Sequence, residues 1–372
     1  MRISLILCLV TFLSVTEGYV ITCYAPMNSP GPSKMEPLVD RKICTHILVI
    51  GGTFVNSDGL LLLPPPDKIR SFVNLKNRDE KVKILLTLTP RNHFMSRIVL
   101  DDGLMRQMAS TLVHYMIDNE LDGFDIDWEF PVWSPDAKKT DKKGFATLLQ
   151  ALRTRFDQEK KPLILMVTAG APYTIAKVGY DIGAINRYAD YLQIMTYDFH
   201  DVSRLEPITG FNAPLRAANY EFLILAKMNS DYSLRYWLQM GLQRNKTVFG
   251  IPTYGKGFTL LTKYLHFPYA PAVGPSKFGG TVDFPTICNL TSNGYTYHWS
   301  SRAATPYFVK NHQWITSEDV NSVRVKASYA KSMNLAGVMI FGLHADDYDG
   351  ICEQGRYPLT SSIHDQMVNK HG

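Results

Sequence analysis

The stretch of residues 121–130 constrains the fold of this chain most strongly, because acidic and apolar side chains alternate along it. Asp125, Asp127 and Glu129 occupy every second position, and Ile126 and Trp128 stand between them. Strict alternation predicts a β-strand whose successive side chains point to opposite faces. One face of this strand therefore carries a row of carboxyl groups. The other face is apolar and needs to be buried against further structure.

Neighbouring carboxyl groups on one face of such a strand lie about 7 Å apart. In a partly buried site they do not all ionise at low cost, because desolvation and like charge raise their pKa values. At least one of them is expected to keep its proton near neutral pH, as a general acid must. The alternative is a row of solvent-facing acids on an edge strand, which leaves the aromatic residues on the reverse face unexplained.

Short apolar runs alternate with longer amphipathic runs along the rest of the chain, which predicts alternating strands and helices. Near-continuous apolar strands separated by helices favour a parallel sheet that is covered on its outer side. Eight such repeats favour closure into a (β/α)8 TIM barrel, an α/β fold whose active sites lie at the C-terminal ends of the strands. The expected strands are 20–24, 46–50, 83–88, 123–128, 163–168, 191–197, 247–251 and 336–342, and the clearest helical segments are 103–118, 142–158, 232–243 and 317–333.

One connection does not fit a simple barrel. The segment between residues 251 and 317 is rich in Gly, Pro, Tyr and Thr and contains Cys288. A connection of this length rarely lacks structure of its own in a compact domain. We therefore expect residues 256–316 to form a small inserted α+β subdomain between the seventh strand and the next helix, within a barrel domain of residues 19–372.

Residues 1–18 are typical of a secretory signal peptide, with Arg2 before an apolar run and small residues before the cleavage site. No later segment is long and apolar enough to span a membrane, so we expect a secreted, extracellular protein with no membrane partner. Cys8 is lost with the signal peptide, and the even number that remains suits an oxidising compartment. Four cysteines allow three pairings, of which the favoured one joins Cys23 to Cys44 and Cys288 to Cys352.

Composition excludes several classes of function. The net charge of +5 is mild and no cluster of Lys and Arg is interleaved with aromatic residues, so nucleic acid is not an expected partner. The ten histidines are scattered without the spacing of a metal site, and neither a metal nor a cofactor is expected. Asn245 and Asn289 begin sequons that are candidates for glycosylation. A monomer is the default expectation.

The octapeptide of residues 122–129, Asp-Gly-Phe-Asp-Ile-Asp-Trp-Glu, resembles the DGxDxDWE signature of the family 18 glycoside hydrolases, the chitinases and chitinase-like lectins. Further matches fall in the same order and cover nearly the whole chain after the first 18 residues. They are Cys23-Tyr24, Cys44-Thr-His46, Met195-Thr-Tyr-Asp-Phe-His200, Gly250-Ile-Pro-Thr-Tyr-Gly255, Asn311-His-Gln-Trp314 and Gln354-Gly-Arg-Tyr-Pro358.

The resemblance implies the same disulfide pairing and a substrate-assisted retaining mechanism, in which the 2-acetamido group of the substrate is the nucleophile. Glu129 would protonate the glycosidic oxygen, Asp127 would hold the acetamide N–H, and Asp125 would share a proton with Asp127. Tyr197 would hydrogen-bond the acetamide oxygen. The implied substrate is chitin or another N-acetylglucosamine glycan, cleaved internally. The candidate substrate-binding residues are Asp198, Met195, Tyr254, Phe341, Trp128 and Tyr24.

The chain also departs from the family pattern, mostly where the family has aromatic platforms for sugar rings. Phe341 stands where the family usually has Trp, residues 89–91 replace Gly-Gly-Trp, and residues 24–28 contain no Trp. Asp201 replaces a Gly. Lys256 replaces an Arg and so loses bidentate hydrogen bonding.

Each platform is worth about 1 to 3 kcal/mol per subsite, so their loss weakens binding of a long polymer. Tyr264, Phe267 and Tyr269 are candidates to replace them. Two functions therefore remain: an active chitinase, favoured by the retained Glu129, and a chitinase-like lectin that binds amino-sugar glycans without turnover. A hydrolase of short or non-chitin N-acetylglucosaminides is a third, weaker alternative.

Overall fold

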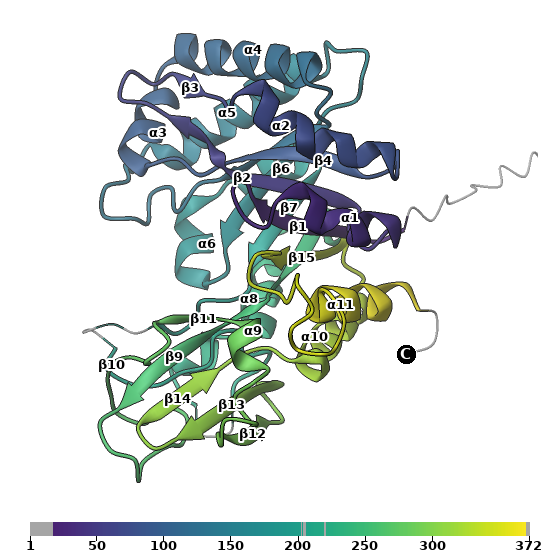
Figure 1. The fold of residues 1–372 in the computed structure, drawn as a ribbon. Coiled ribbons are helices and arrows are strands. Elements are labelled where there is room, and N and C mark those ends of the chain that lie inside the picture. Colours follow the sequence, from purple (N-terminus) through teal and green to yellow (C-terminus); the bar gives the residue numbers. More distant parts are fainter. Residues whose placement is uncertain (1–17, 202, 204–205, 219–220, 370–372) are drawn as a thin grey trace, which may run out of the picture.

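The computed structural model describes residues 18–201, 203, 206–218 and 221–369. The expected signal peptide lies outside these residues except for Gly18 and remains a prediction. Eight parallel strands form a closed barrel that is surrounded by helices, as the sequence predicts (Figure 1). The barrel strands are β1 (Val20–Pro26), β2 (His46–Val55), β4 (Lys83–Leu88), β5 (Gly123–Asp127), β6 (Ile164–Gly170), β7 (Tyr191–Met195), β8 (Thr247–Pro252) and β15 (Gly337–Phe341).

The barrel closes through β1, which pairs in parallel with β2 on one side and with β15 on the other. At the β15 seam the two backbones come very close, because a Cβ placed on Gly337 would lie 1.7 Å from the carbonyl oxygen of Val20. Only a residue without a side chain fits there. The first and last strands of the barrel, β1 and β15, are thus hydrogen-bonded to each other.

The helices follow the strands and cover the outside of the barrel (Figure 1). A two-residue strand, β3 (Leu61–Leu62), pairs with the end of β2. The helices are α1 (Pro32–Asp40), α2 (Pro66–Val73), α3 (Asn92–Ile98), α4 (Asp102–Asp118), α5 (Asp141–Phe156), α6 (Tyr173–Gly179), α7 (Ile182–Tyr188), α8 (Ser230–Gln239), α9 (Phe284–Ile287), α10 (Val320–Ser332) and α11 (Pro358–Val368), and single 3-10 turns lie at Asn74–Asn77, Leu225–Lys227 and Arg244–Lys246.

The boundaries of some elements differ from the expected ones for local reasons. Helix α8 ends at Gln239 rather than at residue 243, because Gly241 takes a positive φ of 99° and stops the helix. Strand β7 ends at Met195, two residues early, because its pairing with β8 stops at Ile194 and the chain turns with Asp198 at a φ of 56°. Strand β2 is longer than expected because β3 pairs with its end.

The alternation along β5 has the predicted consequence. Phe124, Ile126 and Trp128 are fully buried in the apolar layer between the barrel and the helices, where Trp128 packs edge-on against Phe145 of α5 at 5.5 Å. Asp125 is buried on the opposite face of the strand, which is the inside of the barrel. The barrel interior is otherwise filled by a separate apolar cluster that includes Tyr24, Leu48, Leu85, Met166 and Met339.

A second sheet, antiparallel and six-stranded, lies between β8 and α10 in the chain and forms a lobe beside the barrel (Figure 1). Its path runs β10-β9-β14-β13-β12, and β11 pairs with the other part of β9. Trp314 is fully buried in its core against Phe258 and Phe211. The strands are β9 (Tyr254–Leu260), β10 (Ala272–Pro275), β11 (Thr281–Asp283), β12 (Thr296–Ser300), β13 (Thr305–Lys310) and β14 (Gln313–Thr316).

The favoured disulfide pairing is confirmed. Cys23 bonds to Cys44 and Cys288 bonds to Cys352, with Cα atoms 6.0 and 5.9 Å apart. The first bond ties β1 to the start of β2, and the second ties the end of α9 to the segment after β15. Asn245 and Asn289 are both exposed, and their glycosylation stays a prediction. Among the described residues, every helix is too short or too polar to cross a membrane.

Candidate active site

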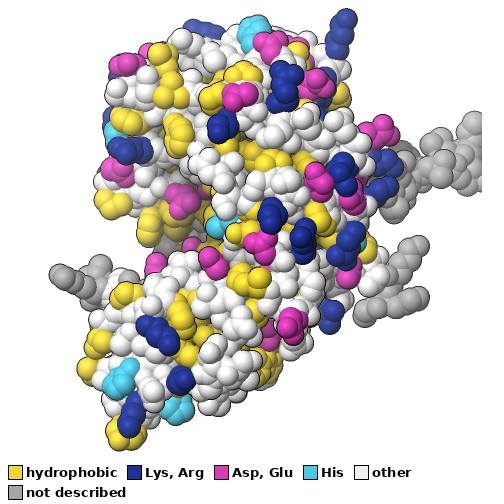
Figure 2. Space-filling model, in the orientation of Figure 1, with side chains coloured by type: hydrophobic (Ala, Val, Ile, Leu, Met, Phe, Trp, Pro, Cys, Tyr) yellow, Lys and Arg dark blue, Asp and Glu magenta, His cyan; other side chains and the backbone are white. Residues whose placement is uncertain are grey.

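A cavity of about 350 Å³ opens at the C-terminal ends of β5, β6, β7 and β15. In Figure 2 the surface is hollowed between the barrel and the antiparallel sheet, on the side where α6 lies in Figure 1. Polar side chains line one part of the cavity: Asp127, Glu129, Tyr197 and Asp198. The remaining lining is almost wholly apolar and comes from Phe130, Trp133, Gly170, Ala171, Pro172, Thr174, Ile175, Met195, Met228 and Phe341.

The three acids of β5 reach this site at three depths. Asp125 is fully buried and does not touch the cavity, Asp127 is 4 % exposed at its bottom, and Glu129 is exposed at its mouth. Asp127 and Glu129 line the same cavity, and Asp125 stands one step below Asp127 on the same face of the strand. A solvent-facing row of acids on an edge strand is therefore ruled out.

Asp125 is held in place by hydrogen bonds to both of its oxygens. Its Oδ2 accepts from the Tyr24 hydroxyl at 2.7 Å, and its Oδ1 accepts from Thr168 at 2.9 Å and from the Gln193 amide at 3.3 Å. Burial raises the pKa of Asp125 to about 6, although these hydrogen bonds oppose the rise. Asp125 therefore takes up a proton more readily than an exposed Asp does.

Asp127 has a different environment. Its Oδ1 is buried and has no hydrogen-bond partner among the described residues. Burial, with the negative charges of Glu129 and Asp125 in addition, raises the pKa of Asp127 well above its usual range. The protonated form of Asp127 is therefore favoured over what an exposed Asp would show. An unpaired buried oxygen is costly, and a polar group of a ligand in the cavity would pair with it.

Glu129 follows the end of β5 and is positioned through its backbone. Its carbonyl oxygen accepts from the Asn92 amide at 2.9 Å, and the other end of that amide, Oδ1, accepts from the Trp128 indole at 2.7 Å. Desolvation in the cleft, followed by the negative charge of Asp198, raises the pKa of Glu129. A carboxyl group with a raised pKa at the mouth of a cavity is suited to act as a general acid.

The wall beside the acids is aromatic. Tyr197 stacks against Phe341 with ring centroids 5.6 Å apart and an angle of 18° between the rings. Tyr254 packs edge-on against both rings, and its hydroxyl donates to Asp198 Oδ1 at 2.8 Å. Tyr254 is thus brought to the site as expected, but as a residue that holds Asp198 rather than as part of the cavity lining.

Besides Tyr254, two further candidate substrate-binding residues do not line the cavity. Trp128 is fully buried between the barrel and α5, because the alternation that puts the acids inside puts Trp128 outside. Tyr24 is 1 % exposed inside the barrel, where its hydroxyl holds Asp125. Both interpretations as sugar-binding residues are wrong. The two side chains position Glu129 and Asp125 instead.

The aromatic residues between β9 and β10 that are candidates to replace the missing platforms do not line this cavity. Tyr264 and Phe267 are 78 % and 53 % exposed and, like Tyr269, are not among the residues that line the cavity. The Tyr269 hydroxyl donates to Glu221 at 2.7 Å. Besides Tyr197 and Phe341, the aromatic residues that line the cavity are Phe130 and Trp133, in the loop that follows Glu129. Loops after the strands of a barrel build its active site, so these residues could have been predicted from their position.

Lys256 was a departure from the family pattern, and the structure makes it a residue of the site. Its Nζ lies 2.9 Å from Asp198 Oδ1 and 3.6 Å from Asp201 Oδ2, and the side chain is almost fully buried. The ring of Tyr254 lies under the same ammonium group at 5.6 Å. Lys256 therefore offsets the negative charge of Asp198, which is the charge that acts on Glu129.

Within the described part of the chain, no group of three His, Cys, Asp or Glu side chains is arranged to hold a metal ion. The chemistry that these residues themselves supply is proton transfer from Glu129 next to a buried polar pocket formed by Asp127 and Tyr197.

Comparison with known proteins identifies relatives of the whole chain. The sequence is 30 % identical to chitotriosidase-1 of Mus musculus over 346 residues, which cover 88 % of this chain and 73 % of that protein. The structure is similar to the group IV chitinase of Ostrinia furnacalis, with a TM-score of 0.86, 25 % identity, and coverage of 94 % of this chain and 100 % of that chain. A structure of YKL-39 in the presence of chitooligosaccharides is equally similar, with a TM-score of 0.85, 25 % identity, and coverage of 94 % and 100 %. The model of the glycosyl hydrolases family 18 matches residues 19–346, and the chain belongs to that family.

Proposed function

We propose that this chain is a secreted glycosidase that hydrolyses β-1,4-linked N-acetylglucosamine polymers or oligomers, such as chitin, by a substrate-assisted retaining mechanism. One observation carries the proposal: Glu129, whose pKa is raised, shares a cavity with the unpartnered buried oxygen of Asp127. An acetamido group placed between them would satisfy that oxygen with its N–H. Its carbonyl oxygen would then lie near Tyr197.

In the first step the acetamide carbonyl oxygen attacks the anomeric carbon while Glu129 gives its proton to the glycosidic oxygen, whose bond to that carbon breaks. Asp127 holds the acetamide N–H and, as positive charge develops on the new ring, loses its proton toward Asp125. Asp125 can accept it because the pKa of Asp125 is about 6. In the second step water gives a proton to Glu129 and attacks the anomeric carbon, whose bond to the acetamide oxygen breaks. The proton on Asp125 returns to Asp127, and the original configuration is retained.

A protein nucleophile is less well supported. Asp198 is the remaining carboxyl group in the lining of the cavity. Its Oδ1 already accepts from the Tyr254 hydroxyl and pairs with Lys256, and both contacts lower its reactivity as a nucleophile.

Secretion is part of the proposal, because the leader-like residues 1–18 precede a chain with two disulfides. Disulfides of this kind persist in oxidising compartments and are rare in the cytosol. Chitotriosidase-1 and the Ostrinia furnacalis chitinase, both named for chitin hydrolysis, support an enzyme rather than a structural protein.

The alternative function is a lectin that binds chitin oligosaccharides without cleaving them. It is favoured by Phe341, which offers a smaller platform than Trp, and by the similarity to YKL-39, which was solved with chitooligosaccharides. Every acid of β5 is nevertheless present, and the pKa of Glu129 is shifted in the direction that acid catalysis needs.

The product of hydrolysis separates these functions. When the purified protein is mixed with chitotetraose, proton NMR is expected to show shorter oligosaccharides whose new reducing ends appear first as the β-anomer. Retention follows from two successive displacements at the anomeric carbon. A protein that shifts the chitotetraose resonances but releases no product is a lectin. Products that appear first as the α-anomer would contradict the substrate-assisted mechanism.

Replacement of Lys256 by Met is expected to move the alkaline limb of the pH–rate profile upward by about one pH unit. The negative charge of Asp198 raises the pKa of Glu129, and without Lys256 that charge is no longer offset. Because Glu129 acts in its protonated form, a higher pKa keeps it active at higher pH. Lys256→Arg retains the charge and should leave the limb in place. An unchanged limb in Lys256→Met would show that Lys256 does not act on Glu129.

A further inference from the structure

The apolar part of the cavity has a composition that the proposed hydrolysis of chitin does not explain. Beyond Glu129 the lining consists of Phe130 and Trp133 from the loop after β5, Pro172 and Ile175 around α6, and Met228 before α8. Thr174 and the indole N–H of Trp133 supply the polar side-chain groups among the lining residues of this part. We call this part of the cavity the apolar arm.

The position of the arm indicates which part of a substrate occupies it. Glu129 protonates the oxygen that joins the reacting sugar to its leaving group, so that oxygen lies at Glu129. The reacting sugar carries the acetamido group and lies over Asp127 and Tyr197, as proposed above. Because Asp127 and Tyr197 are taken by the reacting sugar, we place the leaving group on the other lining residues near Glu129, which are those of the arm.

Trp133 is presented to the arm at a structural cost. The residue is 49 % exposed, which is unusual for so large an apolar residue, and its ring packs edge-on against Phe130 at 5.9 Å. The residue before it, Val132, has a φ of 67°, a conformation that is unfavourable for a β-branched side chain. The turn is closed by hydrogen bonds from Trp133 N–H to Pro131 and from Phe130 N–H to the Ser134 hydroxyl. Packing of the fold alone does not need the indole in this place.

A sugar in the arm would find few partners for its hydroxyl groups. Sugar-binding sites combine an aromatic platform with hydrogen-bonding side chains around the rim of the ring, because buried hydroxyls without partners are costly. Here the hydroxyl of Thr174 and the indole N–H of Trp133 are the hydrogen-bonding side-chain groups among the arm residues. An aryl or alkyl group makes no such demand and gains from contact with Trp133 and Ile175.

Resting on the proposed function, we infer that Trp133 is a specificity-determining residue and that the arm prefers leaving groups with a flat apolar face. The preferred substrates are then N-acetylglucosaminides whose aglycone is an aryl or alkyl group, ahead of chitin oligomers that place another sugar there.

Binding to the Glu129→Gln variant tests this inference without turnover. Three ligands are titrated by calorimetry: methyl β-chitobioside, benzyl β-chitobioside and chitotriose. The benzyl glycoside is expected to bind about tenfold more tightly than the methyl glycoside and at least as tightly as chitotriose. Equal binding of the two glycosides, or chitotriose that binds tenfold more tightly than the benzyl glycoside, would overturn the inference and leave the proposed function standing. If none of the three binds, the proposed function fails as well.

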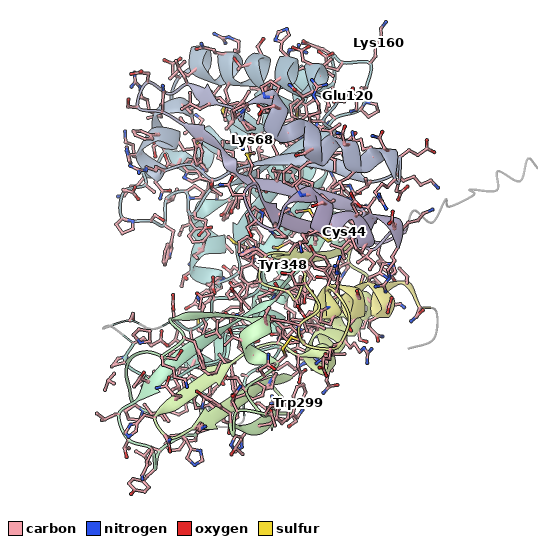
Figure 3. All side chains as sticks on the ribbon, viewed as in Figure 1. Cys44, Lys68, Glu120, Lys160, Trp299 and Tyr348 are labelled. Carbon is pink, nitrogen blue, oxygen red and sulfur yellow. A yellow bond between two sulfur atoms is a disulfide. The ribbon has the colours of Figure 1, made fainter. Side chains whose placement is uncertain are left out.

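Substitution of the platform is the second part of the test. Trp133→Ala is expected to abolish the advantage of the benzyl group while the methyl glycoside binds as before, and Trp133→Phe should restore most of it. Trp299→Ala is the matched control, because Trp299 lies on β12 in the lobe of the second sheet and does not line the cavity (Figure 3). An advantage that survives in Trp133→Ala, or that is lost in Trp299→Ala, excludes Trp133 as the platform.

Discussion

Replacement of Glu129 by Gln is expected to lower kcat/KM for chitotetraose about a thousandfold, while the affinity for the same oligosaccharide stays within about threefold. Gln has nearly the same shape as protonated Glu and keeps a hydrogen bond to the glycosidic oxygen, but it cannot transfer a proton. The backbone that carries residue 129 is held by Asn92 and does not depend on the side chain. The loss therefore falls on the chemical step rather than on binding.

The matched control is Glu120→Gln. Glu120 is exposed and precedes β5, at the opposite end of the strand from the cavity, and is labelled in Figure 3. Glu120→Gln changes the net charge of the protein by the same amount as Glu129→Gln and should leave kcat/KM unchanged. If wild type and Glu129→Gln are equally inert while both bind the oligosaccharide, the protein is a lectin. If both hydrolyse it at the same rate, another group supplies the proton.

A substrate that lacks the acetamido group in the reacting sugar is expected to be cleaved at least a thousandfold more slowly than its N-acetylated counterpart. The hydroxyl that replaces the acetamide cannot attack the anomeric carbon as the carbonyl oxygen does, and the buried Oδ1 of Asp127 would lack the N–H that the proposal gives it. Tyr197 would lose its partner in the same position. The comparison changes the substrate and leaves the protein intact, so it does not depend on the folding of a variant.

The barrel could be predicted from the sequence because each of its strands carries its own signal. The apolar runs and the helices between them identify eight repeats, and all eight strands are present. The alternation along β5 predicts which side chains enter the barrel, and burial of Phe124 and Ile126 opposite Asp125 confirms it. The same alternation excludes Trp128 from the cavity, so that error came from the motif and not from the pattern.

The roles of single side chains could not be predicted, because they depend on contacts between distant parts of the chain. Tyr24 meets Asp125 only when the barrel closes and brings β1 beside the interior face of β5. Lys256 meets Asp198 because β9 starts directly after β8 and returns across the end of β7. Neither contact leaves a local pattern in the sequence.

The second sheet could be predicted only in part. Its length and composition predict inserted structure, but the order of its strands follows from antiparallel pairing across long connections. Strands of three or four residues such as β10 and β11 have too few alternating positions to be recognised. The aromatic residues of this sheet could therefore not be assigned to the cavity or to the surface beforehand.

The most direct test of the central claim compares two fluorogenic chitobiosides with the unmodified protein, one with the 2-acetamido group on the reacting sugar and one with a hydroxyl in its place. Release of the fluorophore is expected from the first substrate, and no measurable release is expected from the second. Equal release from both would mean that a group of the protein is the nucleophile, and no release from either would mean that this site binds its glycan without cleaving it.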